Sequence, residues 1–223
     1  MLWSSPEMNI KVKDELLEIK KGVRLILKSK KFYLGLAVLL VGIYFELYAQ
    51  SILHSWALSG KNFPQFSDVI LDNIPYWKVS FIYDWVAFLT IIVFVGYVVH
   101  KKQYNKAPYF LLLLGLFEIL RSIFILLTPI GNPPGFEGAD SFFNGFSRYE
   151  LGVYPSGHTG GTFIYVLLSN GIYRYITSIL LFFIIAALFL ARGHYTIDVL
   201  SGLLFSYALY SFAEKYLKEK FTI

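Results

Sequence analysis

Long apolar stretches, separated by short polar segments, run along most of the chain. Several of them approach or exceed about 18 residues, the length that a helix needs to cross hydrocarbon. They predict six membrane-spanning helices. We place these at about residues 32–52, 79–100, 108–130, 158–173, 175–192 and 195–216. The fourth is short, so we expect it to start within the interface or to be sheltered by protein.

Residues 1–31 differ from the rest of the chain because many of them are lysines. Their apolar residues recur at steps of three or four, which places them on one face of a helix. These positions are Val12, Leu16, Ile19, Val23 and Ile26. The pattern predicts an amphipathic helix that binds anionic lipid at the interface or, equally, a simple basic anchor before the first span. We therefore expect a basic N-terminal segment, residues 1–31, and a six-helix domain, residues 32–223.

The composition agrees with an all-α integral membrane protein. Hydrophobic residues make up 56% of the 223 residues, and charged residues only 16%, against about a quarter in a soluble domain. The absence of cysteine excludes disulfides and thiolate metal sites. In a membrane protein, a net charge of +5 usually reflects the orientation of the chain in the membrane and contact with anionic lipid. No aromatic and basic repeat of a nucleic-acid module is visible, so we expect no nucleic-acid partner.

The lysines and arginines are distributed unevenly between the two predicted membrane faces. With six spans, 15 of the 20 fall on the side of the N-terminus. The positive-inside rule then predicts that both termini lie in the cytoplasm. On that topology His158, His194 and the segment 131–157 all lie at the extracytoplasmic face. Polar residues therefore gather at one surface, which we interpret as a site.

Two histidines and a carboxylate are the candidate catalytic residues of this site. His194 and Asp198 are four residues apart at the start of the sixth span, so they share one helical face. The carboxylate can accept a hydrogen bond from one imidazole nitrogen and leave the other as a nucleophile or base. His158 arrives from the fourth span. One histidine could attack a phosphorus or acyl centre while the other protonates the leaving oxygen.

The arginines of the chain favour a phosphate-containing substrate over an acyl substrate. Arg121 falls inside the third predicted span, where it needs an anionic partner, and its fork matches phosphate geometry. Arg192 could add a second cation. Backbone amides at the start of the fourth span could donate to phosphate oxygens. The amides concerned belong to Ser156, Gly157 and His158.

Each of these residues also has a purely structural interpretation. Arg121 could pair with Glu118, three residues away, and form a closed ion pair without a ligand. The glycines of 157–161 could serve only close helix packing. Glu46 and Asp84, both inside predicted spans, could be outer-surface or cavity-lining residues, and they receive no catalytic role.

The motifs resemble those of the phosphatidic acid phosphatase type 2 superfamily, and specifically of its sphingomyelin-synthase-like branch. The matching segments are Pro155-Ser156-Gly157-His158-Thr159 and His194-Tyr195-Thr196-Ile197-Asp198-Val199. Arg121 followed by Thr128-Pro129 resembles the arginine-containing motif of the third span in that branch. The resemblance covers roughly residues 121–202, and six spans match the family architecture.

The resemblance implies a mechanism. His194 would form a phosphohistidine, Asp198 would orient it, and His158 would protonate the leaving group and later activate the acceptor. Arg121 would hold the phosphate. The family needs no metal or other cofactor, and its sites commonly face the extracytoplasmic side.

One departure from the family concerns the number of cations. Classical lipid phosphatases carry a first motif rich in lysine and arginine, and a serine-arginine pair shortly before the second histidine. Here the latter places are apolar, from Ala187 to Phe189. Fewer cations suit a phosphodiester, which is a monoanion.

We therefore expect a membrane phospholipid phosphotransferase. It would transfer a head group, or cleave a lipid phosphodiester like a phospholipase C, with an alcohol or water as acceptor. The first alternative is a lipid phosphate phosphatase that acts on monoesters. The second is a non-catalytic lipid-binding or transport protein.

Overall fold

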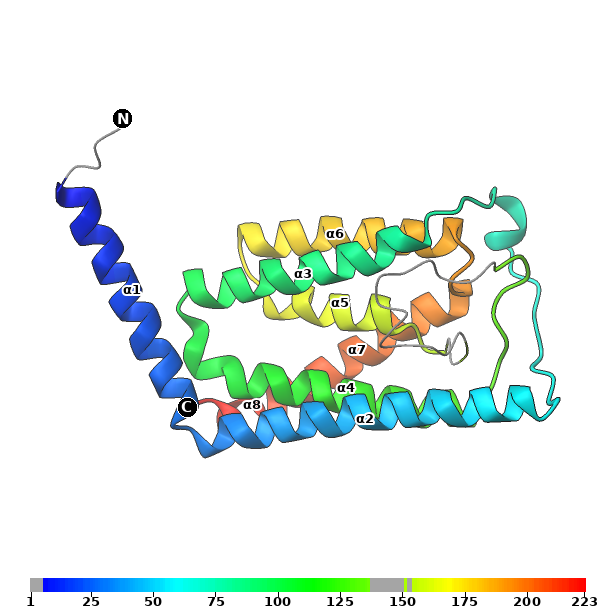
Figure 1. Cartoon of the computed structure of the whole chain (residues 1–223), viewed down its shortest axis with the longest axis horizontal. Helices are drawn as coiled ribbons and strands as arrows, with labels where there is room; N and C mark the ends of the chain where they lie inside the picture. The colour runs from blue at the N-terminus through cyan, green and yellow to red at the C-terminus, as the bar shows by residue number, and fades with distance from the viewer. Residues whose placement is uncertain (1–5, 137–150, 152–153) are drawn as a thin grey trace.

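The structure is a computed structural model, and it describes residues 6–136, 151 and 154–223. The regular elements of the described residues are all helices (Figure 1). They are α1 (Pro6–Leu27), α2 (Lys30–Leu58), η1 (Leu71–Asn73), α3 (Ser80–His100), η2 (Gln103–Lys106), α4 (Ala107–Leu127), α5 (Gly157–Leu168), α6 (Ile172–Leu190), α7 (Thr196–Tyr216) and α8 (Lys218–Phe221). The predicted all-α class is thus confirmed.

Five helices are long and apolar enough to cross a membrane, namely α2, α3, α4 with its preceding turn, α6 and α7. Large apolar side chains on their outer faces are exposed, among them Leu40, Val95 and Phe182. Such side chains suit contact with lipid tails, so the chain has several helices that can span a membrane. The predicted fourth span is α5, a helix of only 12 residues.

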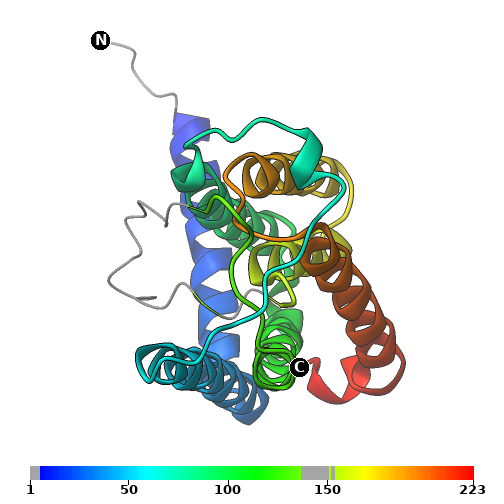
Figure 2. The same ribbon diagram turned by 90° about the vertical axis from the view of Figure 1, so that its right-hand side faces the viewer.

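The short α5 is sheltered by its neighbours. It lies in the middle of the bundle and contacts α3, α4, α6 and α7 (Figure 2). α5 is thus enclosed by four longer helices. This arrangement agrees with the expectation that protein shelters the short fourth apolar segment.

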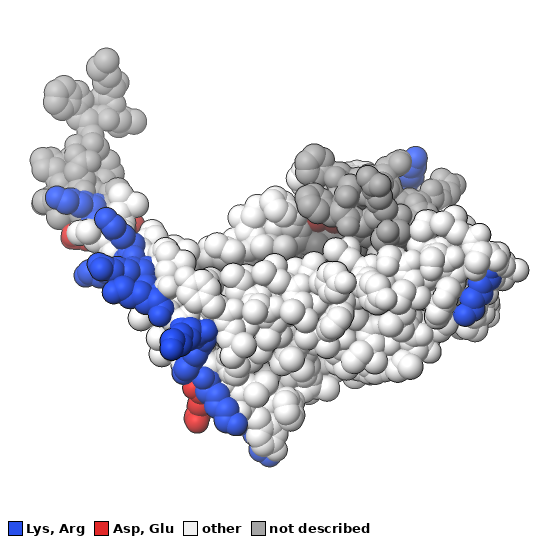
Figure 3. All heavy atoms as spheres, turned by 60° about the horizontal axis from the view of Figure 1, so that its bottom comes forward, with Lys and Arg blue, Asp and Glu red and all other residues white. Residues whose placement is uncertain are grey.

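The bundle has two distinct ends (Figure 1). At one, which we call the basic end, α2 starts, α3 ends, α4 starts, α5 ends, α6 starts and α7 ends. The opposite end, which we call the loop end, carries the connections 59–79, 128–136 and 191–195. The C-terminus lies at the basic end. Helix α1 extends away from the bundle there and carries lysine and arginine side chains along its length (Figure 3).

Glycines allow α2 and α4 to pack closely. A Cβ atom added to Gly42 would lie 2.5 Å from the Gly115 carbonyl oxygen, and one added to Gly115 would lie 2.5 Å from the Leu39 nitrogen. Real side chains do not tolerate such distances, so glycine is required at this contact. The close approach sets Glu46, one turn after Gly42, against the arginine of α4.

A second close contact joins α5 to α7. A Cβ atom at Gly202 would lie 2.8 Å from the Ser156 carbonyl oxygen, and one at Gly160 would lie 2.9 Å from the Ser206 hydroxyl oxygen. The Ser206 hydroxyl donates to the Gly160 carbonyl at 2.9 Å. This crossing brings the start of α5 against the start of α7, where the two candidate histidines lie.

Candidate active site

His194 and Asp198 form a buried pair at the start of α7. His194 lies in the turn between α6 and α7, and its Nδ1 is 3.4 Å from Oδ2 of Asp198. The side chains are only 8% and 0% exposed. The pKa of His194 is lowered from its ordinary value because burial disfavours the imidazolium ion, which Asp198 counteracts in part. The imidazole is thus held neutral, the form in which a ring nitrogen has a lone pair.

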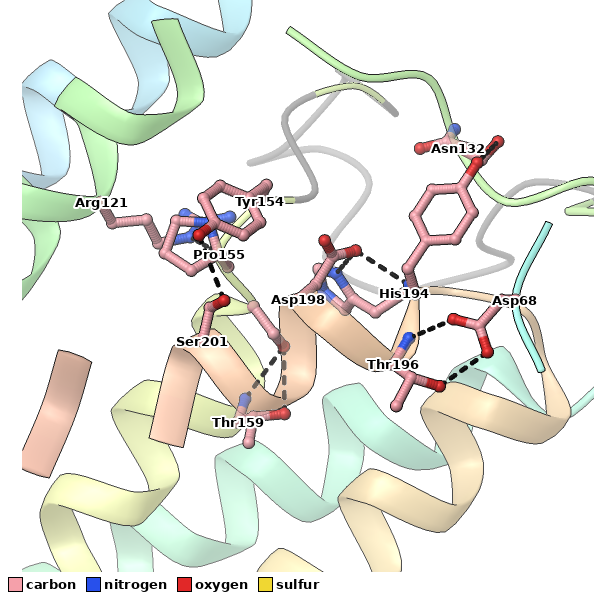
Figure 4. A network of polar contacts seen from close by, with 12 residues as sticks. Asp68, Arg121, Asn132, Tyr154, Pro155, Thr159, His194, Thr196, Asp198 and Ser201 are labelled. Carbon is pink, nitrogen blue, oxygen red and sulfur yellow. Dashed lines mark hydrogen bonds and ion pairs between the residues drawn. The ribbon is translucent and has the colours of Figure 1, made fainter. Parts of the chain in front are cut away.

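Hydrogen bonds fix the carboxylate of this pair. Oδ2 of Asp198 accepts from the Tyr195 amide at 2.9 Å, which caps the first turn of α7. The Asp198 carbonyl in turn accepts from the Ser156 amide at 3.0 Å and so ties α7 to the start of α5. The orientation of the buried pair is therefore set by the backbone of two helices (Figure 4).

His158 lies in the first turn of α5 and has a carboxylate of its own. Its Nε2 is 2.8 Å from Oδ1 of Asp84, which comes from α3. The Tyr83 ring lies against it edge to face, with a centroid distance of 5.0 Å. The ring centroids of His158 and His194 are 6.4 Å apart. The structure thus brings together both predicted histidines and Asp198.

Arg121 of α4 reaches the same place and is held by several partners. Its Nη1 donates to Oε1 of Glu46 at 2.6 Å, and its Nε donates to the Pro155 carbonyl at 3.1 Å. Oε2 of Glu118 lies 3.8 Å away. The expected ion pair within α4 therefore exists, but the shorter contact is to α2. A phosphate bound here would share the guanidinium with Glu46.

A cavity of about 420 Å³ adjoins these groups. Its polar lining includes His158, Arg121 and three carboxylates, those of Glu46, Asp84 and Glu118. Its apolar lining comes mainly from α2 and α3, and comprises Ile43, Ala87, Phe88 and Ile91. His194 and Asp198 are not lining residues. The cavity-lining His158 ring lies 6.4 Å from the His194 ring, measured between centroids.

The connection 59–79 is hydrogen-bonded to the start of α7 (Figure 4). Oδ2 of Asp68 accepts from the Thr196 amide at 2.6 Å, and Oδ1 accepts from the Thr196 hydroxyl at 2.7 Å. Partial burial alone would raise the pKa of Asp68, but these bonds and two from nearby loop amides lower it below its ordinary value. The Tyr195 hydroxyl donates to the Asn132 carbonyl at 3.3 Å. The turn that carries His194 is thus anchored by two loops.

The other predicted phosphate-binding residues have different surroundings. The amide of Ser156 donates to the Asp198 carbonyl, and its hydroxyl caps the start of α5. The Ser156 amide is therefore not available to a phosphate in this structure. Gly157 packs against Arg121, since a Cβ atom there would lie 2.8 Å from its Nε. Arg192, at φ 54°, donates to the Ile74 carbonyl at 3.4 Å and does not line the cavity.

Two site residues were missed by sequence reasoning. Asp84 pairs with a histidine 74 residues away, and Glu46 pairs with an arginine 75 residues away. The only signal in the sequence was that each is a carboxylate inside an apolar span, where ionisable groups are rare and need partners. In the part of the chain that the structure describes, no group of three or more histidine, aspartate or glutamate side chains is placed to hold a metal ion.

The chain matches no protein-family model, and no curated protein matches it significantly. The resemblance to the sphingomyelin-synthase-like branch therefore stays a prediction from the motifs.

Proposed function

We propose that this protein is a membrane enzyme that cleaves the phosphoester of a phospholipid and passes the phosphoryl group to an alcohol or to water. The observation that carries this proposal is the convergence of His158 and His194, each beside a carboxylate, next to the cavity that holds Arg121. Residues from four helices and one turn meet there, which a purely structural role would not require.

The two rings lie close enough to act on one phosphate group. The ring centroids of His158 and His194 are 6.4 Å apart. In the proposed reaction a nucleophile approaches phosphorus, and a general acid stays within hydrogen-bond reach of the leaving oxygen.

The proposed reaction has two steps. In the first, a nitrogen of neutral His194 attacks phosphorus, the bond to the leaving alcohol breaks, and His158 gives its proton to that oxygen. Asp198 stabilises the charge that develops on the His194 ring. In the second, an acceptor alcohol or water loses its proton to His158 and attacks phosphorus, and the bond to His194 breaks. Arg121 holds the phosphate oxygens in both steps.

The charge of the cavity supports a phosphodiester over a monoester. One arginine stands beside three carboxylates, and Glu46 already shares its guanidinium. The carboxylates would repel a phosphate monoester, which is a dianion. A zwitterionic diester would place its phosphate monoanion at Arg121 and its ammonium ion at the carboxylates, so both groups would meet a charge of opposite sign. We therefore favour a zwitterionic phospholipid as donor.

The apolar walls support a lipid substrate. Ile43 of α2 and Phe88 and Ile91 of α3 line the cavity on one side. We propose that the acyl chains lie along these walls while the head group reaches His158 and Arg121. Such a pocket combines an apolar lining with a few convergent polar groups, as ligand sites usually do.

We also propose the finer features of the membrane topology. α5 counts as a sixth, shortened span, α1 lies on an anionic cytoplasmic leaflet, and both termini are cytoplasmic. The support is that lysines and arginines gather at the basic end and along α1, while the candidate site lies at the loop end (Figure 3). The reaction would then take place near the extracytoplasmic face.

The test uses purified protein in nanodiscs, with labelled zwitterionic phosphodiester lipids and phosphate-monoester lipids. His194→Ala is the inactive control, and His100→Ala, at the other end of the molecule, is the matched control. Release of diacylglycerol or ceramide from the diesters, lost only in His194→Ala, is the expected result. Phosphate released from monoesters alone would make the protein a lipid phosphatase. No turnover of either class would indicate a non-catalytic lipid-binding protein.

A further inference from the structure

A second cavity, of about 160 Å³, lies at the basic end. It is formed where α4 starts, α5 ends, α6 starts and α7 ends, so it lies at the opposite end of α5 from His158 (Figure 1). Its polar lining residues are Tyr97, Lys106, Tyr109, Ser169, Asn170, Arg174, Tyr210, Glu214 and Lys218.

The charges around this cavity are mostly positive. Three cations line it against one carboxylate, Glu214. Lys218 donates to that carboxylate at 2.6 Å, and the Tyr109 hydroxyl donates to it at 3.0 Å. The negative charge is thus already matched, which leaves the charges of Lys106 and Arg174 in excess.

Arg174 is held in place without being neutralised. Its Nε donates to the Ser169 carbonyl at 2.9 Å, and its Nη2 donates to the Leu167 carbonyl at 3.2 Å. These acceptors fix the guanidinium but carry no formal charge. Within the described residues, the Lys106 ammonium has no hydrogen bond or ion pair. Lys106 and Arg174 therefore border the cavity without a further carboxylate among its described lining residues.

The Ser169 hydroxyl is an independent sign of a missing ligand. The residue is 1% exposed, and its Oγ finds no hydrogen-bond partner among the residues that the structure describes. A buried hydroxyl without a partner costs free energy, so such groups are usually satisfied by a ligand, an ion or water. A ligand oxygen in the cavity would accept this hydrogen bond.

We infer that this cavity binds a phosphate group, as a free anion or as the head group of an anionic lipid. Lys106 and Arg174 supply the charge, and Ser169 supplies a neutral donor. Inorganic phosphate has the size, the charge and the number of acceptor oxygens that such a cavity suits. This site does not depend on the proposed catalytic activity.

The test measures unfolding temperature in nanodiscs, with the His194→Ala variant as the background so that no lipid is turned over. Inorganic phosphate is titrated into phosphatidylcholine nanodiscs in one arm. Nanodiscs with and without phosphatidic acid are compared in the other. If inorganic phosphate raises the unfolding temperature, the ligand is free phosphate. If only phosphatidic acid raises it, the ligand is a lipid head group.

Lys106→Gln and Lys101→Gln form the matched pair, since both remove one lysine at the same end and only Lys106 lines the cavity. Lys106→Gln should weaken binding about tenfold or more, and Lys101→Gln should leave it nearly unchanged. Ser169→Ala removes a hydroxyl that supports nothing in the fold and should weaken binding several-fold. The inference is overturned if neither probe raises the unfolding temperature, or if both lysine variants respond alike.

Discussion

The two histidine–carboxylate pairs of the candidate site are built differently. His194 and Asp198 belong to one turn of chain and are almost fully buried. His158 and Asp84 come from separate helices, and the histidine side chain is 33% exposed. The buried pair lies where a nucleophile must keep one orientation. The partly buried pair of His158 and Asp84 lies at the cavity, where a proton must enter and leave. Their environments therefore suit two different roles.

The largest expected effect comes from removing the nucleophile. His194→Ala should lower lipid turnover by about 10⁴-fold or more, because it removes the proposed nucleophile and with it the covalent intermediate. Turnover of a labelled phosphodiester lipid measures this effect, and His100→Ala is the control. A loss of less than tenfold would mean that His194 only packs in the core.

Asp198→Asn tests the buried pair while keeping its shape. The amide cannot stabilise a charged imidazole ring, so turnover should fall by about 10³- to 10⁴-fold, as in other histidine–aspartate pairs. Unfolding temperature should change little, because an asparagine oxygen can still accept from the Tyr195 amide. A large drop in unfolding temperature with unchanged turnover of the folded fraction would show that Asp198 is only a helix cap.

Asp84→Asn tests the partly buried pair and should have a smaller effect. Water can reach His158 and replace part of the lost contact, so turnover should fall by about 10- to 100-fold. Lipid turnover measured in parallel for Asp84→Asn and Asp198→Asn shows which pair contributes more to the reaction. If Asp84→Asn costs more than Asp198→Asn, the roles of the two histidines are reversed.

The buried pair also predicts a dependence of stability on pH. An unfolded histidine titrates near pH 6.5, and burial lowers the pKa of folded His194 below that. As the pH falls below about 6.5, the unfolded chain binds more protons than the folded chain, so the free energy of unfolding decreases. Thermal unfolding between about pH 7 and pH 5 should show this loss.

Replacing His194 by glutamine should flatten the pH dependence in that range, and His100→Gln should leave it in place. An identical slope in the His194 variant would show that other groups cause the loss of stability.

The smallest expected effect concerns the loop that anchors the buried pair. Asp68→Asn weakens the bonds to Thr196 and should lower stability by about 1 kcal/mol, as for a lost helix cap. Asp72→Asn is the matched control, because its carboxylate accepts within the same loop, from the Asp68 amide. Turnover should fall only a few-fold in Asp68→Asn. Equal unfolding temperatures for the two variants would argue against the anchor.

The two pairs also explain how much of the site could be predicted. His194 and Asp198 are related by helical spacing, which the sequence displays directly. Asp84 and Glu46 meet their partners only through tertiary packing, and one sequence gives no measure of that. The close contact of α2 with α4 depends on Gly42 and Gly115, whose register cannot be deduced from composition.

The structural alternative for Arg121, an ion pair with Glu118, describes its surroundings only in part for the same reason. An arginine inside a span needs an anionic partner, and the sequence offered Glu118 because it is one turn away. The structure sets Glu46 closer, at 2.6 Å against 3.8 Å. The helices themselves followed well from apolar length, except that α5 proved shorter than the segment 158–173 suggested.

Trapping the covalent intermediate tests the central claim most directly. The protein is mixed with a phosphodiester lipid labelled in its head group, quenched within the first turnover, and digested for mass spectrometry under alkaline conditions that preserve phosphohistidine. The account predicts a head-group phosphoryl adduct on the peptide that contains His194, and no such adduct in His194→Ala. An adduct on His158 instead, or turnover without any adduct, would contradict it.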